Sequence, residues 1–232
     1  MHLIDEAVGI MGSTAIVSGT IPIGVGLAYG IKIKGGCQIC CIFHGDGAAE
    51  AGAFFESVNF AALKKLPVLF VCENNLYSVY SHLRVRQPEG RSIAQMVSAI
   101  GVKSKRGDGN DAEEVMGLAA EAVEEIRNGQ GPYFLEFDTY RWREHCGPNY
   151  DNDIGYRTEA EYLEWKKRDP VEVLSGRMLE SGVVTDSDIA AMENEIKGEV
   201  NNAFTFAENS PFPNADEAYT NLYSSALGGG VV

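Results

Sequence analysis

The sequence is short of positive charge. It has 19 lysines and arginines against 33 aspartates and glutamates, which gives its 232 residues a net charge of −14. Because an acidic surface repels phosphate groups, nucleic acids and anionic membranes are not expected as partners. The length suits one large α/β domain. Internal repeats and low-complexity segments do not stand out, and no secretory signal is visible.

Cysteine is scarce as well. Four of the five cysteines, Cys37, Cys40, Cys41 and Cys72, fall on apolar runs that predict buried strands. Side chains alternate along a strand, so the first three cannot converge on one metal ion. We expect buried free thiols, which suit a reducing compartment, and therefore predict a cytoplasmic protein.

A long stretch without charge, residues 7–31, has the length of a membrane span. Polar side chains, Pro22 and six glycines interrupt it, however, so it is not continuously apolar. We predict a loop followed by a buried helix, and no membrane partner.

The most informative stretch is a strand–helix–strand pattern over residues 37–75. The apolar run 37–44 predicts a strand buried on both faces of a parallel sheet. Gly-Asp-Gly at 45–47 ends it, and apolar residues at helical spacing follow. A second buried strand, 68–72, leads to Asn-Asn at 74–75. The polar residues thus follow the carboxyl ends of both strands, where open α/β sheets bind ligands.

These strand ends carry the donors that a metal-bridged diphosphate needs. Asp46 and Asn75 offer oxygens to Mg²⁺, which takes few protein ligands and fills its octahedron with phosphate oxygens and water. Gly47 and Ala48 are predicted to start a helix, whose first N–H groups bind anions. Gly45 and Gly47 let the backbone approach the phosphates closely.

The run GDGAAEAGAFFESVNFAALKKLPVLFVCENNLYS places 26 residues between Gly-Asp-Gly and Asn-Asn. It closely resembles the alpha subunits of thiamine-diphosphate-dependent 2-oxoacid dehydrogenases, a family that includes the acetoin dehydrogenases. The resemblance implies a three-layer α/β fold with a mainly parallel sheet over residues 1–223, and we expect a flexible tail at 224–232. Relatives carry a further segment before residue 1.

The resemblance also implies the cofactor and its ligands. Mg²⁺ would be held by Asp46, Asn75 and the backbone carbonyl of Tyr77, and would bridge to the diphosphate of thiamine diphosphate. The remaining cofactor contacts implied are backbone groups of Ala15, Val17, Gly45, Gly47 and Ala48.

A second match lies at residues 139–145, where Thr-Tyr-Arg-Trp leads into a loop that covers the active site in the family. The match implies that His145 is catalytic and contacts the diphosphate or substrate, since a histidine can donate to anions near neutral pH. Arg143 and Glu144 replace a usual His-Gly pair. Cys146 replaces a serine that some relatives phosphorylate, which excludes serine phosphorylation at that position.

Charged residues near the diphosphate motif also depart from the family or lack a clear role. Glu50 stands where close relatives usually have Asn, and we expect it to face solvent in the first helical turn. His82, Arg84 and Arg86 lie on a predicted loop. We expect them to be solvated, with substrate contact as the alternative.

By resemblance the chain is the alpha-type subunit of a dehydrogenase that decarboxylates a 2-oxoacid or cleaves acetoin. In the family a Glu of the beta subunit activates the cofactor, and this chain has no candidate for it. We therefore expect it to act only with a beta subunit, in a heterotetramer. Gly26 and Gly30 share a helix face, and core packing and a subunit interface both remain open for them.

Two other functions remain open. The altered loop would suit a transketolase-like or other carboligase subunit that acts on sugars or ketones. The missing N-terminal segment would suit a non-catalytic assembly subunit.

Overall fold

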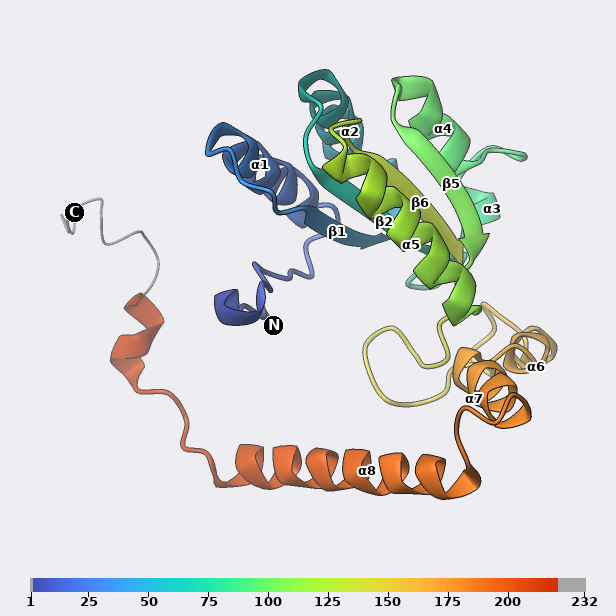
Figure 1. The fold of residues 1–232 in the computed structure, drawn as a ribbon. Helices are drawn as coiled ribbons and strands as arrows, with labels where there is room; N and C mark the ends of the chain where they lie inside the picture. The colour runs from blue at the N-terminus through green and yellow to red at the C-terminus, as the bar shows by residue number, and fades with distance from the viewer. Residues whose placement is uncertain (1, 221–232) are drawn as a thin grey trace. The chain divides into compact units, whose positions relative to one another are not determined.

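The computed structural model describes residues 2–220 and divides into two compact units, residues 1–176 and 177–232. The first unit contains a parallel four-stranded sheet of order β1-β2-β6-β5 (Figure 1). The four strands are β1 (Cys40–Gly45), β2 (Val68–Asn74), β5 (Lys103–Asp108) and β6 (Tyr133–Asp138). The predicted α/β class is confirmed, the 1–223 domain stays a prediction, and the tail at 224–232 lies outside the described residues.

Helices cover both faces of this sheet and make three layers (Figure 1). One face packs against α1 (Thr20–Ile33), α2 (Gly52–Lys64) and α4 (Ile93–Ile100). Among the described residues, the helix that packs on the other face is α5 (Ala112–Arg127). Phe54, Phe70 and Phe134 lie in the core under the three helices, and Leu69, Tyr133 and Leu135 lie under α5.

Capping side chains fix the starts of the helices α4 and α5. Ser92 caps α4 by accepting a hydrogen bond from the N–H of Gln95 at 3.3 Å. Asp111 caps α5 by accepting from the N–H groups of Glu113 and Glu114. Such caps satisfy first-turn N–H groups that have no partner within the helix.

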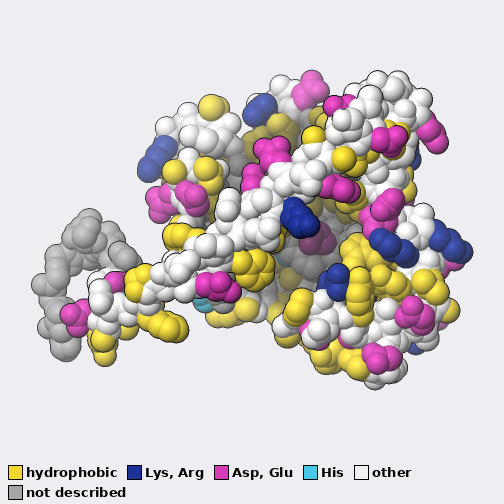
Figure 2. All heavy atoms as spheres, turned by 90° about the horizontal axis from the view of Figure 1, so that it is seen from below, with side chains coloured by type: hydrophobic (Ala, Val, Ile, Leu, Met, Phe, Trp, Pro, Cys, Tyr) yellow, Lys and Arg dark blue, Asp and Glu magenta, His cyan; other side chains and the backbone are white. Residues whose placement is uncertain are grey.

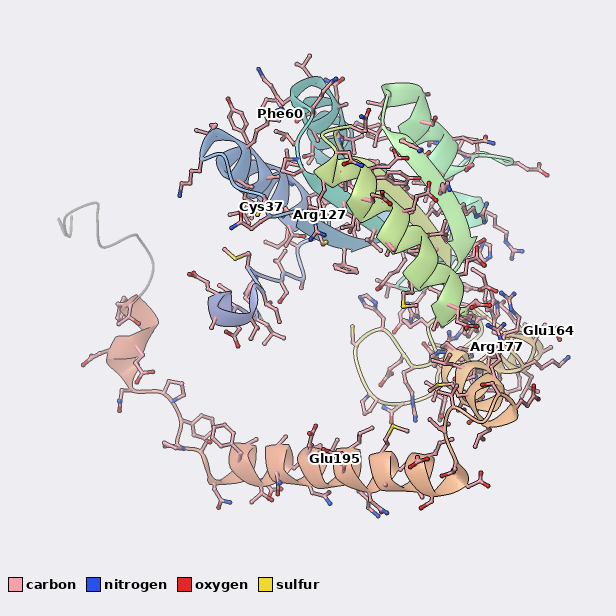
Figure 3. All side chains as sticks on the ribbon, viewed as in Figure 1. Cys37, Phe60, Arg127, Glu164, Arg177 and Glu195 are labelled. Atoms are coloured by element: carbon pink, nitrogen blue, oxygen red, sulfur yellow. The ribbon has the colours of Figure 1, made fainter. Side chains whose placement is uncertain are left out.

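The strand β1 differs from the prediction because it lies at the edge of the sheet. α1 covers one of its faces, whereas α5 packs mainly on β2, β5 and β6. Cys41 and Phe43 are therefore exposed, and Cys37, labelled in Figure 3, is exposed before the strand begins. The predicted burial of Cys37 and Cys41 is wrong, whereas Cys72 on the inner strand β2 is buried.

The glycines of α1 have different surroundings. A Cβ atom on Gly24 would lie 2.6 Å from the Ile42 side chain, so this glycine lets α1 approach β1. Cβ atoms on Gly26 and Gly30 would meet nothing within 4 Å, and both line a groove on the outer side of α1. Core packing within the described residues is thus the role of Gly24.

Shorter elements complete the first unit, and the second unit is mostly helical. The remaining elements of the described chain, in order, are η1 (Glu6–Val8), η2 (Asp46–Glu50), β3 (Tyr77–Ser78), β4 (Ser81–His82), α3 (Leu83–Arg86), α6 (Glu159–Lys166), α7 (Pro170–Glu180), α8 (Asp186–Asn209) and η3 (Ala215–Tyr219). Thr185 and Asp188 form a capping box at the start of α8. Acidic side chains are spread among apolar ones on the face shown in Figure 2. In residues 2–220 we find no helix with the length and apolar character of a bilayer span.

Replacing Gly24 by alanine should destabilise the chain, because the new methyl group must displace the buried Ile42 side chain. Overpacking costs about 1–3 kcal/mol and outweighs the gain of about 1 kcal/mol in helix propensity. Gly26→Ala is the matched control, and it should stabilise α1 by about 0.5–1 kcal/mol since its Cβ is unopposed. Urea unfolding measures both, and equal effects would contradict the packing at Gly24.

Candidate functional site

The carboxyl ends of β1 and β2 meet at one edge of the sheet. Their parallel register pairs Gly45 with Glu73, so that Asp46 follows β1 beside the last residues of β2. Asp46 is only 1% exposed. A Cβ atom on Gly47 would lie 2.7 Å from Oγ of Ser78, so the segment that begins at Tyr77 packs directly on the Gly-Asp-Gly turn. The structure thus brings Asp46 and the 75–77 segment together, as predicted.

The two asparagines have different roles. Asn74 is buried and donates to Oε1 of Glu136 at 2.8 Å, so its side chain links the end of β2 to β6. Asn75 is half-buried, and its Oδ1 accepts from the N–H of Tyr77 at 3.0 Å. A carbonyl oxygen has two lone pairs, so Asn75 keeps one for a metal.

Glu136 is a residue that the sequence analysis missed. It is 1% exposed on β6 and accepts hydrogen bonds of 2.8 Å from Asn74 and from the N–H of Ala94 in the first turn of α4. One buried carboxylate therefore joins the end of β2 to the start of α4. A glutamate within an otherwise apolar strand was the available signal, since lone buried carboxylates need partners.

The segment that contains Ala15 and Val17 lies beside η2. Ser18 is 7% exposed, and its Oγ donates to the carbonyl of Ala48 at 2.8 Å. Ala15 and Val17 are themselves exposed. The sequence analysis placed both near the cofactor but missed the serine that anchors them.

Backbone strain gathers at the same place. Ser18, Leu76 and Val79 all have positive φ angles, 64°, 69° and 54°. Non-glycine residues in this region cost roughly 1–3 kcal/mol each and persist where the surroundings enforce them. Leu76 lies between Asn75 and Tyr77, so its conformation sets how these two residues point.

The helix after Gly-Asp-Gly begins later than predicted. Residues 46–50 form the short 3-10 helix η2, Ala51 is extended, and α2 starts at Gly52. Gly47 and Ala48 still occupy the first turn of η2, where N–H groups lack partners within the helix. The predicted anion-binding groups are therefore present, but on a tight turn.

Arg86 is not the solvated loop residue that the sequence predicts. Its side chain is 12% exposed, and its guanidinium pairs with both Asp46 and Glu50. Glu50 also accepts from the Gln87 amide at 3.0 Å, so it does not simply face solvent. Arg84, on the same short helix, is exposed as expected.

The loop with His145 is closed by the residues that depart from the family pattern. Oε1 of Glu144 accepts from the backbone and side-chain N–H groups of Asn149 at 3.2 and 2.8 Å. The Arg143 guanidinium lies 3.9 Å from the ring centroid of Tyr150. His145 is exposed on the turn they enclose. Its predicted contact with the diphosphate or substrate stays a prediction.

Buried polar groups anchor the root of this loop. Arg141 donates to the carbonyl of Val79 at 3.0 Å and to the Tyr156 hydroxyl at 2.8 Å, which joins the loop to the segment after Tyr77. Arg157, whose side chain is 0% exposed, pairs with the buried Asp151. Burial alone would raise the pKa of Asp151, but the hydrogen bonds from Tyr156 and Arg157 prevail and lower it.

Tyr77 links the 75–77 segment to α6. Its hydroxyl donates to the Glu161 carboxylate at 2.9 Å, and burial together with this bond raises the pKa of Tyr77. At the start of α6, Thr158 accepts a hydrogen bond from the Glu161 N–H, while the Glu161 side chain binds Tyr77 and does not complete a capping box. The tyrosine side chain positions its own backbone carbonyl.

Comparison with known proteins decides the family. The family model described as dehydrogenase E1 component matches residues 1–216. The chain belongs to the dehydrogenase E1 component family. The predicted resemblance to alpha subunits of thiamine-diphosphate-dependent 2-oxoacid dehydrogenases is thereby confirmed.

Curated relatives agree with this assignment. The pyruvate dehydrogenase E1 component subunit alpha of Rickettsia felis is 36% identical over 96% of this chain and 67% of its own length. The Rhizobium meliloti subunit of the same name is 32% identical over 96% of this chain and 63% of its own. A chloroplastic subunit, alpha-3, of Oryza sativa subsp. japonica is 34% identical, with 56% of its length matched. The chain thus spans between about half and two thirds of these relatives.

A solved structure, a thiamin diphosphate-dependent enzyme from Mycobacterium smegmatis, is also similar. It matches 54% of this chain and 22% of its own, with a TM-score of 0.41 and 22% identity.

The residues of the site fit the metal–diphosphate group that the family implies. Asp46 is buried with a cation beside it, Asn75 keeps a lone pair, and the Gly47 position leaves no room for a side chain. Hard oxygen donors of this kind suit Mg²⁺. Among residues 2–220, no three His, Cys, Asp or Glu side chains form an alternative metal cluster.

Glu136→Gln should destabilise the chain by about 1–3 kcal/mol, because glutamine offers one acceptor to two buried donors and turns its own NH₂ toward one of them. Chemical unfolding measures the loss. The exposed Glu73 provides the control, and Glu73→Gln should stay within about 0.5 kcal/mol of the wild type. A wild-type stability for Glu136→Gln would contradict the joint role of this carboxylate.

Asp151→Asn should lower stability by about 3 kcal/mol at pH 7, since it leaves the buried Arg157 without its counter-charge. The folded-state pKa of Asp151 is lowered, so its stabilisation is present above the unfolded value near 3.8 and is lost as pH falls through the folded value. The gap between wild type and variant should therefore begin to narrow below about pH 4 and close once the pH falls below the lowered pKa of Asp151. Fluorescence of Trp142 and Trp165, both near this cluster, follows unfolding. Asp153→Asn, at an exposed position, should show no such gap at any pH.

Proposed function

We propose that this chain is the part of an E1 alpha subunit that binds the magnesium-diphosphate end of thiamine diphosphate for oxidative decarboxylation of a 2-oxoacid. The buried Asp46, placed beside the 75–77 segment at the carboxyl edge of the sheet, is the observation that carries this proposal. The relatives named pyruvate dehydrogenase support pyruvate as the first substrate to test. Acetoin cleavage is the second.

The chain's own residues would hold the cofactor's charged end. Asp46, Oδ1 of Asn75 and the carbonyl of Tyr77 would bind Mg²⁺, and the N–H groups of Gly47 and Ala48 would bind phosphate oxygens. When bound, thiamine diphosphate supplies a nucleophilic carbon and an electron sink for decarboxylation. His145, on its closed turn, would donate a hydrogen bond to the diphosphate or to the substrate carboxylate.

We further propose that the chain acts with a beta subunit, in a heterotetramer, and that the partner supplies the activating glutamate. Exposed apolar side chains support an interface. Ile23 and Ile33 on α1 and Phe43 on β1 are each more than 60% exposed, at 62%, 67% and 63%. Burial of such apolar side chains against a partner would be favourable. The five free cysteines support a reducing location such as the cytoplasm.

Calorimetric titration with thiamine diphosphate and Mg²⁺ tests the cofactor site. The wild type should bind only in the presence of the metal, and Asp46→Ala should lose this binding, because the metal loses its only side-chain carboxylate among the proposed ligands. Asp5→Ala, at an exposed aspartate of the N-terminal segment, is the control and should bind as the wild type does. Equal binding by Asp46→Ala would contradict the site.

Assays with the beta subunit added separate the remaining functions. Turnover of pyruvate or another 2-oxoacid supports the dehydrogenase, and turnover of ketose phosphates alone would favour a carboligase. Turnover of a 2-oxoacid by the chain without its partner would contradict the shared site. Cofactor binding with no turnover of either class would favour an assembly subunit.

A further inference from the structure

A cation already occupies the carboxylate on which the proposed metal site depends. Asp46 is 1% exposed, and a carboxylate this buried must be paired with a charge or with several donors. Within the described residues its cationic partner is Arg86, which donates through Nη2 to Oδ2. The pair is charge-assisted and largely desolvated, which makes it stronger than a surface ion pair.

Arg86 and a divalent cation cannot use Asp46 in the same way. Mg²⁺ must contact a carboxylate oxygen at about 2 Å, and a guanidinium on the same small group would lie within a few ångströms of the ion. Two positive charges at that separation repel strongly where water is excluded. Metal binding at Asp46 therefore requires Arg86 to withdraw.

A second carboxylate is placed to receive Arg86. Its Nη1 pairs with Oε1 of Glu50, and Gln87 holds that same oxygen with a hydrogen bond of 3.0 Å. Nε of Arg86 donates to the carbonyl of Ser81 at 3.0 Å. The guanidinium can thus release Asp46 while it retains two of its three partners. The segment that carries it, α3, is only four residues long.

We propose that Arg86 occupies the Asp46 carboxylate in the metal-free protein, and that a divalent cation displaces it so that it pairs with Glu50 alone. The inference rests on the proposed cofactor site, since it supposes that Asp46 is a metal ligand. Glu50 and Arg86 act together, because Glu50 keeps its ion pair with the guanidinium that the metal displaces from Asp46. Loading of the site is then an exchange of one cation for another, and its affinity is set by both residues.

The test is a calorimetric titration of the full chain with Mn²⁺ at a fixed concentration of thiamine diphosphate. Arg86→Ala should raise Mn²⁺ affinity about tenfold, the equivalent of one hydrogen bond between charged groups that no longer has to be broken. Arg84→Ala removes the same charge from the same short helix at an exposed position, and it should leave the affinity unchanged. Arg86→Gln provides a second variant that keeps a polar side chain, and it should also bind Mn²⁺ more tightly.

A charge-balanced variant separates competition from simple electrostatics. Arg86→Ala leaves the site with one more negative charge, whereas Glu50→Asn combined with Arg86→Ala removes one charge of each sign. If Arg86 competes for Asp46, the double variant should still bind Mn²⁺ more tightly than the wild type. An affinity equal to that of the wild type in the double variant would overturn the inference.

Asp46→Ala distinguishes the failure of this inference from the failure of the proposed function. Wild-type binding that Asp46→Ala abolishes, together with unchanged affinity in both Arg86 variants, overturns the role of Arg86 alone. Absence of Mn²⁺ binding from the wild type and every variant overturns the metal site and the inference together. Binding of Mn²⁺ by the Arg86 variants but not by the wild type would be the strongest support for competition between Arg86 and the metal.

Discussion

The burial of one carboxylate governs the architecture of this site. Asp46 follows an edge strand yet is 1% exposed, because η2, the 77–78 segment and Arg86 all close over it. Moving an ionised carboxylate out of water is costly unless cations or N–H groups replace the lost solvation. In this structure the Arg86 guanidinium meets the requirement, and in the proposed cofactor site a metal ion would meet it instead.

Several features keep the surrounding backbone in place at some cost. Leu76 and Val79 adopt left-handed conformations, and Glu136 is an ionisable group within an inner strand. Each is balanced by specific contacts, such as the two hydrogen bonds that Glu136 accepts from Asn74 and Ala94. Strain and buried charge concentrated at one edge of a sheet are typical of sites whose geometry is fixed before a ligand arrives.

The sequence predicted local features well and long-range ones poorly. The strand–helix–strand pattern over residues 37–75 could be predicted because each element shows its own local periodicity. The exposure of Cys41 could not, since it depends on β1 being an edge strand, which the order of strands decides.

The same distinction applies to the site. Asp46, Asn75 and Tyr77 follow from a motif with fixed spacing, and their segments are indeed adjacent. Arg86 lies 40 residues from Asp46, and Glu136 lies 62 residues from Asn74. No periodicity or spacing connects these pairs, because only the folded sheet brings them together. For His145 the motif predicts a contact with the diphosphate or substrate, and the structure places the side chain on an exposed turn.

The two edges of the sheet differ in how they are protected. β5 carries Lys103, Lys105 and Arg106, whose charges oppose pairing with a foreign strand. β1, with the sequence CCIFHG, has no such charge, and within residues 2–220 no strand pairs with its outer edge. An apolar edge of this kind can accept a further strand, so β1 rather than β5 is the edge at which the sheet could be extended by another chain.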